Sequence, residues 1–360
     1  MQNARIPRRL PALILVPTLA LLLASSALAA GTVTGAVYVE GASAQLAGVA
    51  ISDGRQVVLT DENGRYHLDV ADSFALIRIT VPSGYRPLDD RWFDRVHVDG
   101  DVRLDFVLVP DDQPDTWTFA HVTDVHITPE RVEHVRRFTE DVNTLADPPV
   151  ALVISTGDLV HNLRAIPDYD GLREAFGMYA DAMSGLNAPR LDVIGNHDLA
   201  GYQTTEITPE HELFGLGAYR RLMGPEWFSY CYGGVRFVAL NNTRVNIPVD
   251  RRYHSAWDEE GLRWLEADLA VADEDTPIIL LMHQPPEAAT NRAEFDTILA
   301  GRTVLAIFYG HRHALVQGEY NDIPAYQGGA LDRCQNAPTG YQLVTIGIDR
   351  EIETQYRPVE

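Results

Sequence analysis

The sequence predicts a small all-β sandwich, residues 30–110, followed by a larger layered α/β domain, residues 116–360. Two observations predict these fold types, and a third separates them. The first region consists of short strand-like segments divided by turns, without a helical period. In the second region, apolar strand segments alternate with amphipathic helical ones. Residues 111–115, which are polar and contain Pro114, mark the linker between the two.

The first 29 residues have the layout of a secretory signal peptide. Residues 5–9 contain three arginines, Leu10–Ala24 is mostly apolar, and Ala27–Ala29 offers small residues for cleavage. The apolar stretch contains prolines and is shorter than the ~20 residues of a spanning helix. We therefore expect cleavage after Ala29, export to a periplasmic or extracellular location, and no stable membrane insertion afterwards. An uncleaved N-terminal anchor is the alternative.

Composition excludes several classes of function. The 360 residues carry a formal net charge of −22, and the basic residues are all arginine. Without lysine, Schiff-base and P-loop chemistry are excluded, since both require a lysine amine. A strongly acidic chain also lacks the basic surface that broad nucleic-acid binding requires, so we do not expect such binding. The composition does not determine an oligomeric state.

The two cysteines leave two interpretations open. Cys231 and Cys334 could form a disulfide in an oxidising compartment, or they could be two free, buried thiols. Sequence separation does not tell whether their Cα atoms approach to the ~7 Å that a disulfide requires.

The N-terminal region contains six strand-like segments. Asp53-Gly54 and residues 60–64 are turn signals between them. The pattern around these turns resembles the transthyretin-like or carboxypeptidase-regulatory-like sandwich. The turn carboxylates do not follow EF-hand spacing, so turn chemistry is favoured over calcium binding. The expected strands are Thr32–Val39, Gly48–Ser52, Val57–Thr60, Tyr66–Val70, Leu76–Val81 and Val102–Val109.

The second region alternates between two kinds of segment. Apolar runs predict strands at Trp117–Thr123, Val150–Thr156, Leu191–Ile194, Val235–Leu240, Pro277–Met282 and Thr303–Tyr309. Amphipathic patterns predict helices at Arg131–Leu145, Leu172–Met183, Glu259–Leu269 and Arg292–Leu299. The sequence after His313 is again rich in strand formers.

Short polar motifs follow five of these strands, where α/β proteins tend to place ligand sites. Each motif alone is a weak signal, but their joint occurrence in this order indicates a dinuclear metal site. Their oxygen and imidazole donors suit Fe, Mn or Zn. The motifs are Asp124-Val125-His126, Gly157-Asp158, Gly195-Asn196-His197-Asp198, His283 and Gly310-His311-Arg312-His313.

This ordered set resembles the calcineurin-like metallophosphoesterase superfamily, and the resemblance covers about residues 116–350. It implies an α/β four-layer sandwich, in which two facing β-sheets are flanked by helices. It also implies a ligand set. One metal would be held by Asp124, His126, Asp158 and His313, and the other by Asp158, Asn196, His283 and His311. Asp158 would then bridge the two ions.

The resemblance implies a metal-dependent phosphoric ester hydrolase, in which a hydroxide that bridges the metals attacks phosphorus. His197, beside a ligand, would protonate the leaving oxygen or stabilise the developing charge, and Asp198 would orient it. His161 and Asn162 follow Asp158 closely and are candidate contacts for substrate or for a ligand. The loop Leu199–Trp227 would either contribute to specificity or pack on the core.

Three functional alternatives remain at this point. The substrate would be a small-molecule or polymer phosphoester. A phosphodiester is slightly favoured, because no arginine cluster near the motifs promises to hold a dianionic phosphate. A phosphomonoesterase acting through the same site is the second interpretation. The third is a non-catalytic exported binding protein with the α/β domain as its scaffold.

Overall fold

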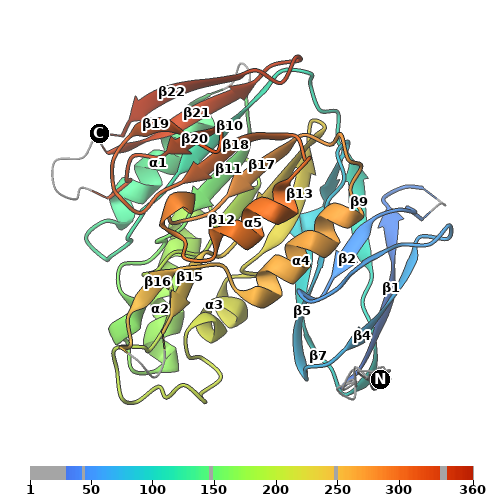
Figure 1. Cartoon of the computed structure of the whole chain (residues 1–360), viewed down its shortest axis with the longest axis horizontal. Coiled ribbons are helices and arrows are strands. Elements are labelled where there is room, and N and C mark those ends of the chain that lie inside the picture. The colour runs from blue at the N-terminus through green and yellow to red at the C-terminus, as the bar shows by residue number, and fades with distance from the viewer. Residues whose placement is uncertain (1–29, 43–44, 146–148, 247–249, 333–338, 360) are drawn as a thin grey trace, which may run out of the picture.

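A computed structural model describes residues 30–42, 45–145, 149–246, 250–332 and 339–359. The described chain forms an all-β region, β1–β9, and then an α/β region, β10–β22 (Figure 1). The predicted order of fold types is therefore confirmed. The expected signal peptide, residues 1–29, and Cys334 lie outside the described residues.

The N-terminal region is a sandwich of two sheets. One sheet has the order β4-β1-β9-β6, with β8 also paired to β1, and the other has the order β3-β2-β5-β7. Val33 and Leu68 of the first sheet share a fully buried core with Ile77 of the second. The strands are β1 Gly31–Val39, β2 Ala50–Ser52, β3 Val57–Leu59, β4 Arg65–Val70, β5 Phe74–Ile79, β6 Tyr85–Pro87, β7 Phe93–His97, β8 Gly100–Arg103 and β9 Phe106–Pro110.

The single strand expected at Val102–Val109 is wrong, because the chain forms two strands there. β8 and β9 both pair in parallel with β1, but with different halves of it. Between them, the Leu104 amide donates to the carbonyl of Thr34, and the Asp105 carboxylate accepts from the backbone amide of Ala36. This side-chain contact replaces a ladder bond and divides the strand. Strands β6 and β7 were also missed.

Two further sheets form the frame of the α/β region. The first has the order β12-β11-β10-β21-β22, and the second has the order β13-β14-β17-β18-β20-β19. A short hairpin of β15 and β16 is added. Bounds in the first sheet are β10 Trp117–Val122, β11 Val150–Thr156, β12 Arg190–Val193, β21 Gly340–Ile346 and β22 Ile352–Pro358. The remaining strands are β13 Phe228–Tyr232, β14 Val235–Ala239, β15 Thr243–Val245, β16 Tyr253–Ser255, β17 Ile278–Leu281, β18 Val304–Tyr309, β19 Val316–Tyr320 and β20 Ile323–Gln327.

The two sheets pack face to face, and helices cover their outer faces. Successive side chains along a strand point alternately to the other sheet and to a helix. Phe119 packs in the core between the sheets with Phe308, whereas its neighbour Ala120 packs with Phe138 of α1. On the second sheet, Leu280 faces α4 and α5. The predicted four layers are therefore present. The helices are α1 Val132–Thr144, α2 Tyr169–Met183, α3 Leu216–Leu222, α4 Glu259–Ala270 and α5 Arg292–Leu299. The sequence pattern missed α3.

The sandwich contacts the α/β region through tryptophans. The indole nitrogen of Trp227 donates to the carbonyl of Gly54 at 3.0 Å, and that of Trp264 donates to Oγ of Ser52 at 3.1 Å. Both acceptors belong to the β2 end of the sandwich, which lies beside α4 in Figure 1. The tryptophans thereby fasten one turn of the sandwich to the α/β region.

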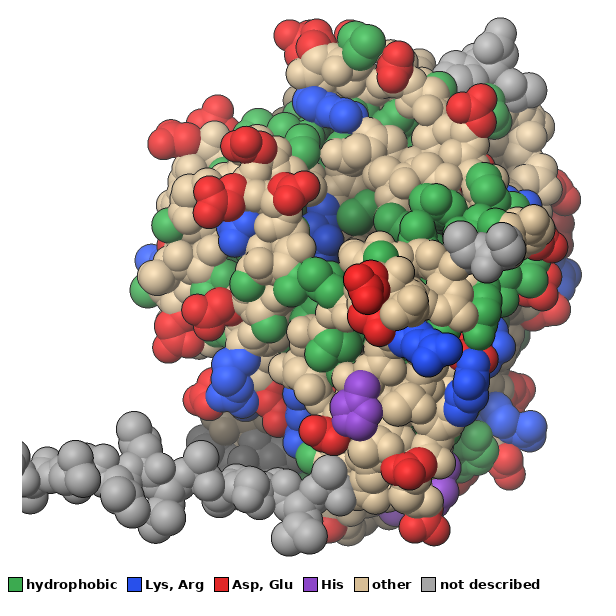
Figure 2. All heavy atoms as spheres, turned by 90° about the vertical axis from the view of Figure 1, so that its right-hand side faces the viewer, with side chains coloured by type: hydrophobic (Ala, Val, Ile, Leu, Met, Phe, Trp, Pro, Cys, Tyr) green, Lys and Arg blue, Asp and Glu red, His purple; other side chains and the backbone are tan. Residues whose placement is uncertain are grey.

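Figure 2 looks onto the side of the molecule that carries the N-terminal sandwich. Acidic side chains are spread over this face, with arginines between them, in keeping with the acidic composition. Within the described parts of the chain, none of the helices combines the length and apolar composition that a membrane crossing requires.

Candidate metal centre

The five motifs meet because of how their strands are arranged. β10, β11 and β12 run in parallel in one sheet, and β14, β17 and β18 run in parallel in the other. The carboxyl ends of parallel strands lie at the same sheet edge. Two groups of donor atoms gather there, each within 4.8 Å, namely Asp124, His126 and His313, and Asp158, His283 and His311.

The backbone at these positions adopts an unfavourable conformation. Asp124, His126, Asp158, His311 and His313 all have φ between 44° and 76°. This left-handed region disfavours residues with a Cβ, and such residues cluster at functional sites. The surrounding packing therefore holds these side chains in an arrangement that the isolated turns would not favour.

Close approach explains two of the motif glycines. A Cβ on Gly195 would lie 2.2 Å from Oδ1 of Asp158. A Cβ on Gly157, where φ is 96°, would lie 2.6 Å from Nδ1 of His283. Any larger residue at either position would displace a side chain of the cluster.

The first group has the spacing of atoms that share a cation. Oδ1 of Asp124 lies 3.2 Å from Nε2 of His313 and 3.8 Å from Nε2 of His126. The two Nε2 atoms are 3.3 Å apart. Donor atoms about 2.0–2.2 Å from one transition-metal ion must lie roughly 3–4 Å from one another. The three side chains therefore fit a metal ion.

The second group has the same spacing and is joined to the first. Nε2 of His283 lies 3.2 Å from Oδ2 of Asp158, 3.1 Å from Oδ1 of Asn196 and 3.3 Å from Nδ1 of His311. Oδ2 of Asp158 also lies 3.5 Å from Nε2 of His126. All seven predicted ligand residues are thus brought together, with Asp158 between the two groups.

Backbone groups orient these side chains. Nδ1 of His283 lies 2.8 Å from the carbonyl of Thr156, to which it donates, so that Nε2 faces the cluster. Oδ2 of Asp124 accepts from the amide of His311 at 2.9 Å and from Oγ1 of Thr123 at 2.9 Å. Oδ1 of Asp124 is left facing the imidazoles.

The protonation states of the cluster suit metal binding. Burial lowers the pKa of His126 and that of His311 to about 4, which keeps both imidazoles neutral. Burial disfavours the charged forms of His283 and Asp158 as well. Their mutual attraction outweighs it, raising the pKa of His283 to about 9 and holding that of Asp158 well below its usual range. A cation would replace the proton on His283, since metal ligands must be deprotonated.

The two predicted catalytic residues, His197 and Asp198, lie at this centre, but their hydrogen-bond partners differ from those expected. Nδ1 of the half-exposed His197 donates to the carbonyl of His161. The carboxylate of Asp198 instead accepts from the amides of Val160, at 3.1 Å, and Gly195, at 2.8 Å. The expected contact between Asp198 and the His197 imidazole is not among the contacts of the described residues. Asp198 joins two backbone loops, and the His161 carbonyl orients His197.

His161 also brings its imidazole to this side of the centre. Nitrogens of His126, His161 and His197 lie within 4.8 Å of one another and form a third group that could hold a metal. Its position three residues after Asp158 was the signal available in the sequence.

Arg131 and Asp332 were missed by sequence reasoning. Nη1 of Arg131 lies 2.9 Å from Oδ2 of the buried Asp332 and donates to the carbonyl of His126 at 3.1 Å. The amide of Asp332 donates to the carbonyl of Asp124. The pair thus holds the backbone of the Asp124-Val125-His126 motif through the carbonyls of Asp124 and His126. No local sequence pattern indicates this pair.

The loop Leu199–Trp227 contains structural aromatic residues. Tyr219 is 1% exposed and donates to the carbonyl of Asp192 at 2.9 Å. Arg220 contacts the buried carboxylate of Glu226. Packing on the core therefore accounts for Tyr219, and the ion pair with Glu226 accounts for Arg220.

Comparison with known families agrees with this geometry. Residues 118–315 match the family described as calcineurin-like phosphoesterase, and residues 31–110 match the family described as its N-terminal domain. The chain belongs to the calcineurin-like phosphoesterase family. Calcineurin-like phosphoesterases are dinuclear metal enzymes, in keeping with the two joined ligand groups. The likeness of the N-terminal sandwich to transthyretin-like domains stays a prediction.

Curated relatives of this calcineurin-like chain include enzymes of two kinds. A probable cyclic nucleotide phosphodiesterase of Rhodopseudomonas palustris is 29% identical over 194 residues, 49% of this chain and 62% of that protein. A 3′,5′-cyclic adenosine monophosphate phosphodiesterase of Escherichia coli is 26% identical over 185 residues, 47% of this chain and 57% of that protein. A serine/threonine-protein phosphatase of Mus musculus is 24% identical over 234 residues, 62% of this chain and 72% of that protein. The match thus spans less than two thirds of either phosphodiesterase.

Among solved structures, a dimetal phosphatase from Danio rerio aligns with a TM-score of 0.48 and 15% identity, covering 68% of this chain and 96% of that one.

Proposed function

We propose that this chain is an exported phosphoesterase that requires two metal ions, Fe, Mn or Zn, and that prefers phosphodiesters. The position of Asp158 carries the proposal, because its Oδ2 lies between His126 of one ligand group and His283 of the other. Two bound cations would supply Lewis acidity and would lower the pKa of a water molecule for attack on phosphorus.

The charges of the ligands favour an anionic substrate. Asp124 and Asp158 contribute two negative charges, which only half neutralise two divalent ions. Asn196 contributes a neutral oxygen 3.1 Å from Nε2 of His283. The centre therefore keeps a positive charge that attracts a phosphoester, although the chain as a whole is acidic.

His197 is placed to transfer a proton to the leaving group. Its Nδ1 is engaged by the carbonyl of His161, so Nε2 is the nitrogen that remains for the substrate. The ring is half-exposed, and its centroid lies 4.6 Å from that of His126 at the metal centre. An imidazole in this position can transfer a proton to a departing oxygen.

The arginines around the centre favour a diester over a monoester. Arg131 pairs with Asp332, and Arg164 donates to Oδ1 of Asn162 at 2.7 Å. Arg312 lies 3.4 Å from Glu287. Each of these guanidinium groups thus already has a protein acceptor. A monoanionic diester requires fewer cationic partners than a dianionic monoester.

The names of the relatives leave the monoesterase as the second candidate. Two relatives are named as phosphodiesterases and one as a phosphatase. A non-catalytic binding protein is the third candidate, but a scaffold has no need of seven converging ligands. Export rests on the layout of residues 1–29.

One experiment tests the activity. Purified protein reconstituted with Mn, Fe, Zn or Ni is assayed on bis-p-nitrophenyl phosphate and on p-nitrophenyl phosphate, with metal content measured on the same samples. We expect two ions per chain and a higher kcat/KM on the diester. The Asp158→Asn variant lacks the shared carboxylate, and its loss of turnover would assign the activity to this centre. Turnover of the monoester alone would overturn the diester preference. Metal binding without turnover of either ester would overturn the proposal that the protein is an enzyme.

A further inference from the structure

One arginine at the rim of the metal centre has two guanidinium nitrogens that no protein group uses. Arg164 lies in the short 3₁₀ helix Leu163–Ala165, which follows Asp158 in the chain. Its Nε donates to Oδ1 of Asn162 at 2.7 Å, and Nη1 and Nη2 have no hydrogen-bond partner among the described residues. The side chain is partly exposed, and neither nitrogen is among the buried polar atoms that lack a partner. Both nitrogens are therefore accessible to a ligand.

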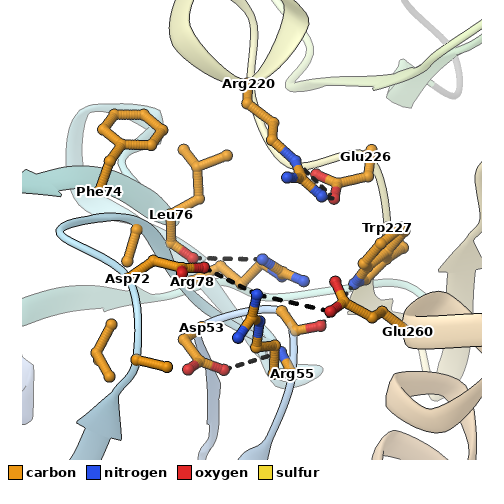
Figure 3. A pocket seen from close by; sticks show the side chains of 14 residues that line it. Asp53, Arg55, Asp72, Phe74, Leu76, Arg78, Arg220, Glu226, Trp227 and Glu260 are labelled. Atoms are coloured by element: carbon orange, nitrogen blue, oxygen red, sulfur yellow. Dashed lines mark hydrogen bonds and ion pairs between the residues drawn. The ribbon is translucent and has the colours of Figure 1, made fainter. Parts of the chain in front are cut away.

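The arginines between the sandwich and the α/β region do not offer such nitrogens. Arg55 lies 3.0 Å from Asp72, and Arg220 contacts Glu226, as the dashed lines in Figure 3 show. Nε and Nη2 of Arg78, in the same figure, lack a partner, but this side chain is 4% exposed and both nitrogens are buried. The unpaired donors of Arg78 are closed to a ligand, whereas those of Arg164 are open.

An unpaired arginine is unfavourable beside this centre. Two divalent ions with two carboxylate ligands leave the centre positive, and like charges repel. Arg131 and Arg312, which also lie close to the motifs, are compensated by Asp332 and Glu287. Arg164 has no carboxylate partner of this kind in the described chain, and its one printed side-chain acceptor is a neutral amide. Its charge is available to an anion that arrives with the substrate.

The helix that carries Arg164 is fixed to the loop of the predicted proton donor. The amide of Leu163 donates to the carbonyl of His197 at 3.1 Å. Just before the helix, the carbonyl of His161 accepts from Nδ1 of His197. Burial lowers the pKa of the His161 imidazole, and the charges of His197 and Arg164 act in the same direction. Arg164 thus lies within electrostatic range of the side of the centre where the leaving group departs.

Tyr253 lies on the other side of Arg164. Its ring centroid lies 5.8 Å from that of His311, a residue of the second ligand group. Burial raises the pKa of this partly buried phenol, and Asp158 acts in the same direction while Arg164 acts against it. Arg164 itself is hydrogen-bonded to Asn162 and to none of the seven ligand residues. An anion at its Nη atoms is therefore a different group from a phosphoryl group at the metals.

The free end of Arg164 is shaped for an oxyanion. Because Asn162 holds Nε, the guanidinium is fixed in advance, which lowers the cost of binding. Nη1 and Nη2 then present two N–H groups that match two oxygens of a carboxylate or a phosphate. We propose that Arg164 binds a second anionic group of the substrate, so that the preferred phosphoesters carry a carboxylate or a further phosphate on the esterified alcohol. This inference rests on the proposed phosphoesterase function.

Alkylphosphonates, which have no ester bond to hydrolyse, test the site in the metal-loaded full chain. The probes have alkyl chains of increasing length that end in a methyl group, a carboxylate or a second phosphonate. Isothermal titration calorimetry at constant ionic strength gives each Kd. At the chain length that spans the distance from the metals to Arg164, the wild type should bind an anionic end about tenfold more tightly than a methyl end. The carboxylate and phosphonate series distinguish the two kinds of anion.

Three variants assign the effect. Arg164→Met removes both Nη atoms and should abolish the preference for an anionic end at every chain length. Arg244→Met is the matched control, because it removes the same charge from β15, where Arg244 lies 3.6 Å from Asp258, and it should keep the preference. Arg164→Lys covers the case in which Arg164→Met does not fold. It keeps the charge without the planar fork, so most of the preference should be lost.

Three results would overturn the site at Arg164. One is equal binding of anionic and methyl ends by the wild type at every chain length, and another is a preference that persists in Arg164→Met. The third is an equal loss in Arg244→Met, which would mean long-range attraction without a contact. Failure of every phosphonate to bind would also overturn the site, whether or not esters are hydrolysed. A preference that depends on Arg164 in a protein that hydrolyses no ester would support the site and overturn the phosphoesterase.

Discussion

The backbone amide of His197 donates a hydrogen bond of 2.8 Å to Oδ1 of Asp158. This contact joins the loop after β12 to the loop after β11, and it leaves Oδ2 of Asp158 facing the imidazoles of both ligand groups. Because His197 holds Asp158 through its backbone, its side chain can be replaced without removing the contact. Metal binding and proton transfer can therefore be separated by substitution.

Asp158→Asn should lose both metal and activity. The neutral amide keeps the shape of the side chain but removes the negative charge that lies between the two groups. Elemental analysis of variant and wild type, purified in parallel, measures the effect. His197→Asn is the comparison, because it alters the same pair of loops and should keep both ions. A full metal content in Asp158→Asn would contradict the bridging role.

His197→Asn should lower kcat by the ~10²–10⁴-fold that is typical of general acid–base catalysis. The deficit should be smaller for p-nitrophenyl esters, whose leaving group needs little protonation, and larger for alkyl esters. Steady-state kinetics on both ester types measure it. An equal deficit on both types would mean that His197 stabilises charge on phosphorus instead, and loss of metal would make it a ligand.

Asp268→Asn should destabilise the fold by about 3–5 kcal/mol, because it leaves the charge of Arg236 buried and unpaired. Asp268 is 1% exposed and accepts from Nε of Arg236 at 3.0 Å and from Oγ of Ser229 at 2.6 Å. Urea unfolding measures the change. Asp170→Asn, whose side chain is 87% exposed beside Arg173, should change stability by less than about 1 kcal/mol. Similar values for the two variants would contradict the prediction.

Asp141 should make the stability depend on pH under acidic conditions. Burial alone would raise the pKa of Asp141, but Arg357, 2.7 Å away, and Tyr341, 2.6 Å away, lower it. The unfolded chain then takes up its proton near pH 4, at a higher pH than the folded one. The contribution is therefore present above about pH 4 and is lost as the pH falls through the lower, folded-state value.

The Asp141→Asn variant isolates this contribution. It should be less stable than the wild type at neutral pH by about 1 kcal/mol, and the difference should shrink as the pH falls below about 4. Unfolding by urea at several pH values measures it. The exposed Asp170→Asn again serves as the control. A difference that grows on acidification would show that the sign is wrong.

The mature protein from its native host should begin at Ala30. The basic, apolar and small-residue segments of residues 1–29 predict removal during export. Intact-mass spectrometry of the exported fraction measures the N-terminus. Retention of Met1 on the exported protein would favour the uncleaved anchor.

The pairing of the cysteines stays a prediction. Cys231 lies in β13, where its sulfur accepts from Nη1 of Arg236 at 3.9 Å, and burial raises the pKa of its thiol. Thiol titration of denatured, unreduced protein distinguishes a disulfide with Cys334 from two free thiols.

The sequence by itself determined the fold types, the approximate bounds of α1, α2, α4 and α5 and of the strands that precede the five motifs, and the seven candidate ligands. These features depend on local patterns, because an apolar run that ends in a polar motif predicts both a strand and the place where that strand presents its ligands. The strand Val150–Thr156 and the following Asp158 illustrate this. The carboxyl ends of parallel strands lie at the same edge of a sheet, so the sequence already predicted that the motifs after these strands form a cluster.

Only the tertiary structure decided which groups support the cluster. Arg131 and Asp332 are 201 positions apart, the partner of Nδ1 of His197 is a backbone carbonyl, and Asp198 binds amides of two different loops. The division of β8 from β9 and the unpaired donors of Arg78 likewise depend on neighbours distant in sequence. Local sequence specifies the conformation that a segment prefers. The acceptors that each polar group finds are set by packing between segments, which carries no local signature.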